Sequence, residues 1–319
     1  YNYLRDYDIA YWGLYKIEKA LGFSFAGSIL LSTLLIIISY FYIVKAMKGD
    51  KYMLMLFLPA TLLTTTYALR QFHAIIYINI AIGMMLFADK SLKNNKKNVF
   101  LSILLIFLAY HTHGASIAYV IPFIIFLFFK KIQPVSYKIT ITAYLLAIVF
   151  SGLITSLFNE TFLSLFQYLT TTDHLQGYID NAESRLFGVD SLDESTFGHG
   201  GIYQLFHYAG YICLLYITDR ALKIKPNVNV TIIYNIVVFA ILMQQVFFTQ
   251  EIMRRLIDPF VILYFIPLGY ALNVFGKYKK QRFYGYQLYG FCILIAMLQI
   301  YYPMFKFLIS FGKAGFVWN

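Results

Sequence analysis

The segment LRQFHAIIYINIAIGMMLFADKSLKNNKKNVFLSILLIFLAYHTHG, residues 69–114, alternates polar tips with long apolar runs. It opens on an arginine, a glutamine and a histidine, and then follows an apolar run to a turn with four lysines. A second apolar run leads from that turn to a pair of histidines. How a permanent charge is accommodated beside such runs depends on the solvent around the segment, and composition identifies that solvent.

The whole chain is far more apolar than a soluble domain. Of its 319 residues, 60% are hydrophobic and 13% are charged, with a mean hydropathy of +0.65. Soluble domains carry about 25% charged residues. Apolar runs without a polar face recur along the chain, and several reach the roughly 20 residues that cross a bilayer core. The sequence therefore predicts an all-α polytopic membrane protein.

The net charge of +11 is concentrated in short connectors between the apolar runs. Five clusters hold 17 of the 26 basic residues and only three of the acids. They are Lys45, Lys48 and Lys51; Lys90, Lys93, Lys96 and Lys97; Lys130, Lys131 and Lys138; Arg220, Lys223 and Lys225; and Lys277, Lys279, Lys280 and Arg282. The positive-inside rule places all five in the cytoplasm, so the charge reports topology and predicts no nucleic-acid partner.

Alternation between the two sides requires about ten transmembrane helices in this chain. We expect them near residues 22–44, 52–69, 72–89, 98–111, 114–129, 139–158, 202–219, 230–249, 256–275 and 285–306. Residues 1–319 then form a single transmembrane domain with both ends outside. Residues 1–21 are expected to be an external amphipathic segment, and residues 159–201 an extracytoplasmic loop with short surface helices. The opening lacks an initiator Met, so we expect one more helix upstream.

Two hairpins are short for the bilayer that they must cross. Only 38 residues separate the first lysine cluster from the second, giving arms of about 28 Å, and only 32 separate the second from the third. The hydrocarbon core is about 30 Å thick. We therefore expect the tips at 70–73 and 110–116 to lie below the outer surface. A third polar tip, at 250–259, faces the same side.

Arginines at these tips need an anionic partner or water, because an unpaired charge below the membrane surface costs roughly a few kcal/mol. Arg70, Arg254 and Arg255 are fixed cations that would suit a bound phosphate or diphosphate. The alternative is an interfacial Arg70 whose charged end reaches the surface, or one paired with Asp258 or Glu251.

The histidines leave several interpretations open. His111 and His113 lie two residues apart, whereas zinc ligands on helices prefer a spacing of four, so no metal site and no cofactor is predicted. His113 suits a general base or a hydrogen-bond donor to phosphate, and structural hydrogen bonding is the alternative. His73 is a turn residue or a substrate contact, and His207 is a contact between helices. The cysteines Cys213 and Cys292 fall inside predicted helices, so we expect no disulfide.

Acidic groups lie in the two external segments. Asp6 and Asp8 are either solvated carboxylates or groups that contact substrate and accept a proton. In the long loop, Asp180, Glu183 and Arg185 are surface charges, unless the loop closes over a sugar. Glycine-rich nucleotide motifs are absent from the sequence, and polar groups other than lysines are sparse on the cytoplasmic side. These features favour a lipid-linked donor over a soluble nucleotide sugar.

Residues 69–126 resemble the EpsG/Wzy-like membrane polysaccharide polymerases. The family pattern joins an R-Q-x-x-A tip, a basic cytoplasmic turn, and a histidine tip before a helix that contains proline. Arg70, Gln71 and Ala74 match the first motif, and His113 with the following GAS matches the second loosely, ahead of Pro122.

Further positions carry the resemblance along the chain. His111 is a rival for the family histidine. Arg254 or Arg255 corresponds to the later family arginine, and the stretch from Asp8 to LGFSF at 21–25 is similar to the family's early acidic loop and short amphipathic helix.

The resemblance implies a GT-C-like glycosyltransferase in the bacterial inner membrane, with its active site facing the periplasm. It would polymerise undecaprenyl-diphosphate-linked oligosaccharides into O-antigen, capsule or exopolysaccharide. Arg70, Arg254 and Arg255 would stabilise the diphosphate leaving group without a metal, and His113 or Asp8 would accept the proton.

The other members of the predicted site are Gln71, His73, His111 and Arg185, which would bind substrate. A flippase and a chain-length regulator are the expected protein partners, and the lipid bilayer is the solvent.

Three other activities remain open from the sequence. A lipid-linked oligosaccharide flippase or transporter could also bind diphosphate through arginines, and an O-antigen ligase-type transferase would differ only in its acceptor. A membrane O-acyltransferase would need a histidine near the cytoplasmic side. Because the polar groups crowd one side of the membrane, the pattern favours an enzyme over a transporter, which would carry them along a pathway through both leaflets.

Overall fold

The computed structural model describes residues 9–49, 51–62, 69–87, 96–112, 133–169, 202–246, 257, 260–278 and 283–301. Within these ranges the regular structure is entirely helical, which confirms the all-α prediction for this part of the chain. The elements are α1 (Ile9–Ala20), α2 (Phe25–Ala46), α3 (Lys51–Leu62), α4 (Leu69–Phe87), α5 (Lys96–Thr112), α7 (Tyr137–Leu169), α10 (Ile202–Ile224), α11 (Val228–Val246), the 3₁₀ helix η4 (Ile262–Tyr264), α13 (Phe265–Tyr278), α14 (Phe283–Ala296) and the π-helical turn η5 (Met297–Tyr301).

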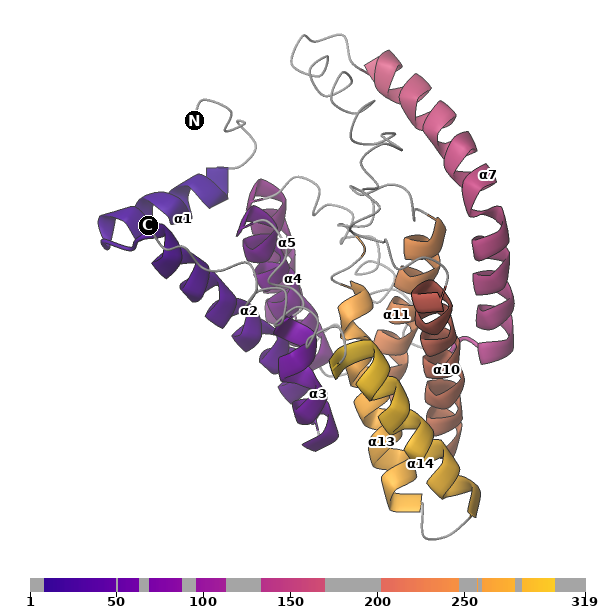
Figure 1. The fold of residues 1–319 in the computed structure, drawn as a ribbon. Coiled ribbons are helices and arrows are strands. Elements are labelled where there is room, and N and C mark those ends of the chain that lie inside the picture. Colours follow the sequence, from indigo (N-terminus) through magenta and orange to yellow (C-terminus); the bar gives the residue numbers. More distant parts are fainter. Residues whose placement is uncertain are drawn as a thin grey trace.

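The helices form two groups that follow the order of the chain (Figure 1). Helices α1 to α5 make one group, α7 to α14 make the other, and α3 packs against α13 where the groups meet. Every side chain from residue 260 to residue 272 is buried, so α13 begins as the central helix of the bundle. This segment, FVILYFIPLGYAL, is apolar on all sides, as a helix surrounded by other helices must be.

Hydrogen bonds between α2 and α4 fix their direction and register. The hydroxyl of Ser32 lies 3.3 Å from Nε2 of His73, and the Asn79 side chain donates to Ser39 Oγ at 3.1 Å. All four residues are buried. Because the partner numbers rise together, α2 and α4 run parallel, and the chain between them must return to the starting end. This agrees with the predicted alternation of helix direction.

Two helix boundaries differ from the sequence prediction. Residues 70–73 occupy the first turn of α4, so the prediction that they form the turn itself is wrong. Arginine, glutamine and histidine are compatible with a helix, and neither glycine nor proline interrupts them. Helix α7 continues to Leu169, eleven residues beyond its predicted end, because the apolar spacing of FLSLFQYL extends the same helix. The crossing predicted at 114–129 lies outside the described residues.

The outer surface of the bundle is rich in large apolar side chains. Exposed ones include Ile29, Leu30, Leu34 and Ile38 on α2, Phe100, Ile103 and Phe107 on α5, Val149, Leu153 and Leu157 on α7, and Phe291, Leu294 and Leu298 on α14 or η5. Soluble proteins rarely expose apolar patches of this extent, whereas lipid requires them. The helical segments 27–46 and 228–246 are long and apolar enough to cross a membrane, and four shorter apolar helical segments accompany them in the described residues. The number of crossings stays a prediction.

Several lysines gather at one end of the bundle, which we call the lysine-rich end. It comprises Lys48 after α2, Lys51 at the start of α3, Lys96 at the start of α5, Lys225 after α10 and Lys277 near the end of α13. Contacts between these chain ends show that they share one side of the molecule. For example, Lys48 and Lys225 line the same cavity. Their placement in the cytoplasm stays a prediction.

The packing of α3 on α13 depends on a glycine. A Cβ built on Gly269 would lie 2.9 Å from both the backbone nitrogen and Cα of Met53 on α3. Backbone atoms cannot move aside as a flexible side chain can, so only glycine permits this separation of the two helices. Gly290 on α14 is the opposite case, because nothing lies within 4 Å of its built Cβ.

We predict that Gly269→Ala lowers stability by about 1–3 kcal/mol through overpacking. Gly290→Ala should be neutral, or should stabilise the helix by about 0.5–1 kcal/mol. Thermal unfolding of the two purified variants in the same detergent measures the difference. Equal transition temperatures for both variants would show that α3 and α13 do not approach as closely as described.

Candidate functional site

Helix α1 turns a carboxylate toward the protein and apolar side chains away from it. Glu18 is 6% exposed, whereas its neighbour Ile17 is 61% exposed and Leu21, just after the helix, is 69% exposed. A helix in water would show the reverse pattern. This orientation suits a helix lying at a membrane interface, as predicted for residues 1–21. The acidic group of Glu18 faces the inside of the protein.

Glu18 meets residues of α2 and α4 in a buried polar group that we call the α1 cluster, defined as Glu18, Ser32 and His73. One Glu18 carboxylate oxygen lies 3.9 Å from Nε2 of His73, and Ser32 Oγ lies 3.3 Å from the same nitrogen. The ring of Tyr11, on α1, meets the His73 ring edge-on at 5.8 Å between centroids. The cluster therefore ties α1 to both α2 and α4.

The hydrogen bonds of Ser32 determine which nitrogen of His73 carries a proton. Ser32 has a single hydroxyl hydrogen, which it donates to the backbone carbonyl of Ser28 at 2.7 Å. Its contact with His73 must then be one in which Ser32 accepts, so Nε2 of His73 is the donor.

The Glu18 oxygen nearest His73 is buried and accepts no hydrogen bond from the described residues. The distance of 3.9 Å to His73 permits electrostatic attraction and is too long for a hydrogen bond. A buried carboxylate is costly unless a positive charge or donors compensate it. The Glu18 carboxylate therefore faces the His73 ring across a gap that no hydrogen bond between described residues closes.

His111 lies in the last turn of α5, at the level of the α1 cluster. Ser102 on α5 donates to the carbonyl of Ala81 on α4 at 3.3 Å, and the two helices are antiparallel neighbours. Counting nine residues from each partner brings His111 level with Phe72, next to His73.

The surroundings of the His111 ring are mostly aromatic. Phe107 and Tyr110 meet it edge-on, with centroids 4.3 Å and 5.3 Å away, and its Nδ1 is buried without a hydrogen-bond partner in the described part of the chain.

The described helices bring several predicted site segments to the same end of the bundle. Arg70 and Gln71 begin α4, one turn before His73, although their side chains are not among those described. Helix α1 packs against α5, so the chain that follows Asp8 lies beside the helix that carries His111 (Figure 1).

The remaining predicted site residues are Asp8, His113, Arg185, Arg254 and Arg255, which lie outside the described residues. Among the residues that the structure describes, no three His, Cys, Asp or Glu side chains are grouped to hold a metal ion.

Glu18 and Ser32 are members of the cluster that the sequence prediction missed. The spacing of residues in the sequence could have indicated them. Tyr11, Leu14 and Glu18 lie on one face of α1, which is its less exposed side. Ser32 and Ser39 lie seven residues apart in an apolar helix, a spacing that places small polar groups on one helix–helix contact.

Comparison with known proteins now identifies the family. The chain matches the model of the EpsG family over residues 1–310, whereas no curated protein and no solved structure matches it. The match extends over almost all of the 319 residues and confirms the resemblance carried by the Arg70 and His113 motifs. The family and the apolar helices together indicate a membrane protein of the polysaccharide polymerase type. The chain belongs to the EpsG family.

Proposed function

We propose that this protein is an extracytoplasmic glycosyltransferase that joins undecaprenyl-diphosphate-linked repeat units into a surface polysaccharide. One observation carries the proposal beyond family membership. The segments that hold Arg70, Gln71, His73 and His111 meet at one end of the bundle, while most of the exposed side chains along it are apolar.

The reaction needs charge stabilisation at the donor and proton removal at the acceptor. The acceptor sugar hydroxyl attacks the anomeric carbon, a C–O bond forms, and the bond to the lipid diphosphate breaks with its electron pair leaving on oxygen. Guanidinium groups from Arg70, Arg254 and Arg255 would stabilise that developing charge without a metal. His113 or Asp8 would accept the hydroxyl proton.

The α1 cluster has a positioning role in this proposal. His73 is 4% exposed, so we assign it to holding the first turn of α4 in place rather than to contact with the reacting atoms. Glu18 attracts His73 from α1, and Ser32 accepts from it on α2, so the turn containing Arg70 is anchored on two sides. A cation that must face a diphosphate within a fraction of an ångström needs such support.

The direct test uses purified protein in nanodiscs with an undecaprenyl-diphosphate-linked repeat unit as its only substrate. A ladder of longer lipid-linked products is expected. Transfer only to a lipid A core acceptor would identify a ligase, and movement of the substrate across a vesicle without a new glycosidic bond would identify a flippase. Either result would overturn the polymerase proposal.

Arg70 is tested by two substitutions and one control. Arg70→Ala should lower the polymerisation rate by about 10²–10³-fold, and Arg70→Lys should lower it less, because a lysine keeps the charge and loses the two-pronged geometry. Arg220→Lys is the control, since Arg220 lies on α10 near the lysine-rich end, with its guanidinium 5.4 Å from the centroid of the Tyr216 ring. Full activity of Arg70→Ala would remove this residue from the mechanism.

Glu18 tests the positioning role. Glu18→Gln keeps the side-chain shape and removes the charge beside His73, so the α4 turn should loosen and kcat should fall about tenfold to a hundredfold. Lys19→Ala, at the adjacent exposed position on α1, should keep its rate. The product ladder is measured for both, together with the thermal transition in detergent. If Glu18→Gln polymerises at the unmodified rate, the cluster has no part in activity.

A further inference from the structure

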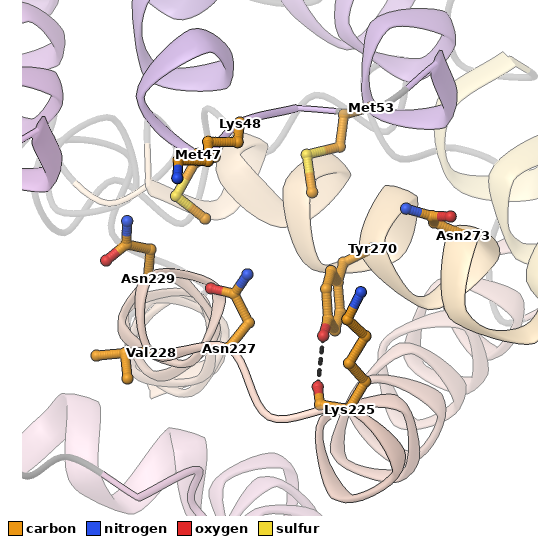
Figure 2. A pocket seen from close by; sticks show the side chains of 9 residues that line it. All are labelled: Met47, Lys48, Met53, Lys225, Asn227, Val228, Asn229, Tyr270 and Asn273. Atoms are coloured by element: carbon orange, nitrogen blue, oxygen red, sulfur yellow. Dashed lines mark hydrogen bonds between the residues drawn. The ribbon is translucent and has the colours of Figure 1, made fainter.

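A cavity of about 400 Å³ lies at the lysine-rich end. None of the predicted site residues is among its described lining residues. Its described lining consists of Met47, Lys48, Met53, Lys225, Asn227, Val228, Asn229, Tyr270 and Asn273 (Figure 2). These residues come from both helix groups: the end of α2 and the first turn of α3 on one side, and the α10–α11 connection, the first turn of α11 and α13 on the other. The volume falls within the usual range for small-molecule pockets, about 300–1,000 Å³.

The polar part of the lining is cationic and rich in amides. Lys48 and Lys225 contribute ammonium groups, and Asn227, Asn229 and Asn273 contribute carboxamides. Neither lysine forms an ion pair with a described carboxylate. The described residues at this end form an ion pair between Lys223 and Asp219, 2.7 Å apart. This ion pair involves neither of the two cavity lysines.

Lys48 occupies a backbone position where glycine would be easier to accommodate. Its φ is +52°, and no other non-glycine residue among those described has a positive φ. Its N–H bonds to the carbonyl of Lys45 at 3.0 Å, and the N–H of Gly49 bonds to Val44 at 2.9 Å. This pair of bonds ends α2 with a Schellman motif, in which the position of Lys48 is usually glycine. The fold thus tolerates strain and keeps an ammonium group beside the cavity.

Hydrogen bonds to the backbone fix the opposite wall. The hydroxyl of Tyr270 donates to the carbonyl of Lys225, and Asn227 Oδ1 accepts from the N–H of Val230 at 3.1 Å. The Asn229 side chain reaches the carbonyl of Leu86 at 3.5 Å. In Figure 2 the Lys225 side chain rises alongside the Tyr270 ring, and the Asn227 carboxamide points toward the space between the helices. These bonds hold the backbone of Lys225 and the side chains of Asn227 and Asn229 at the wall of the cavity.

We propose that this cavity binds the phosphate group of an anionic ligand at the lysine-rich end. Ammonium groups bind phosphate as point charges, carboxamide N–H groups donate to its oxygens, and the first turn of α11, which supplies Val228 and Asn229, adds the positive end of a 19-residue helix. An anionic phospholipid headgroup and a soluble phosphate compound share this chemistry. The site is separate from the glycosyl-transfer chemistry proposed above and does not depend on it.

The test compares two double variants with the same change in charge. Lys48→Gly with Lys225→Gln removes both cavity ammonium groups, and Lys48→Gly also relieves the positive φ. Lys45→Gln with Lys277→Gln removes two exposed lysines near the same end that are not among the lining residues. The single variants Lys48→Asn and Lys225→Gln provide the readout if the first double variant does not fold, because asparagine tolerates a positive φ.

Binding is measured on the whole chain with two probes. In one arm, native mass spectrometry counts phosphatidylglycerol retained from nanodiscs of phosphatidylglycerol and phosphatidylcholine. In the other, inorganic pyrophosphate is titrated in phosphatidylcholine nanodiscs while the thermal transition is followed. The unmodified chain and the control variant should bind at least one probe. The cavity variant should bind the same probe with an affinity lower by a factor of about ten or more.

The two arms also separate the sources of the phosphate. Retention of phosphatidylglycerol alone identifies a lipid headgroup, and a shift with pyrophosphate alone identifies a soluble ligand. If neither probe binds the unmodified chain, the proposal is overturned. Equal loss in the cavity and control variants would overturn it too, since that result would reflect only the overall charge of this end.

Discussion

Polar side chains inside a lipid-facing bundle must find partners within the protein, and the contact between α2 and α4 is where this constraint is met most clearly. Ser32 pairs with His73 and Ser39 pairs with Asn79, all of them buried. Hydrocarbon offers no hydrogen bonds, so any sliding of α4 along α2 would leave both pairs unsatisfied. The register of the two helices follows from this, and with it the level at which the first turn of α4 lies.

That register connects the fold to the candidate site. With α4 fixed on α2, Glu18 of α1 reaches His73, and the Ser102 contact sets α5 so that His111 lies at the same level. The polar groups at this end are thus held by contacts between four helices. At the opposite end, lysines and amides line a cavity between the two helix groups. Polar groups gather at the two ends because a charge on the apolar surface between them is costly.

The sequence predicted the features that depend on composition and missed those that depend on neighbours. Apolar runs and lysine clusters were sufficient for an all-helical membrane protein and for the grouping of the lysines at one end. The turn predicted at Arg70 is wrong, because arginine, glutamine and histidine are polar and yet continue a helix well. Glu18 was missed since a carboxylate in an amphipathic external helix is expected to face water, and only the tertiary contact with His73 explains its burial.

The order of α2 and α4 in the chain has a consequence for biogenesis. A helix carrying a histidine and an asparagine is a poor candidate for entering lipid alone, because each polar side chain resists leaving the aqueous channel of the insertion machinery. During synthesis α2 emerges first, and Ser32 and Ser39 are then already in place when His73 and Asn79 arrive. We therefore expect the serines of α2 to provide hydrogen-bond partners that help the later, more polar helix enter the membrane.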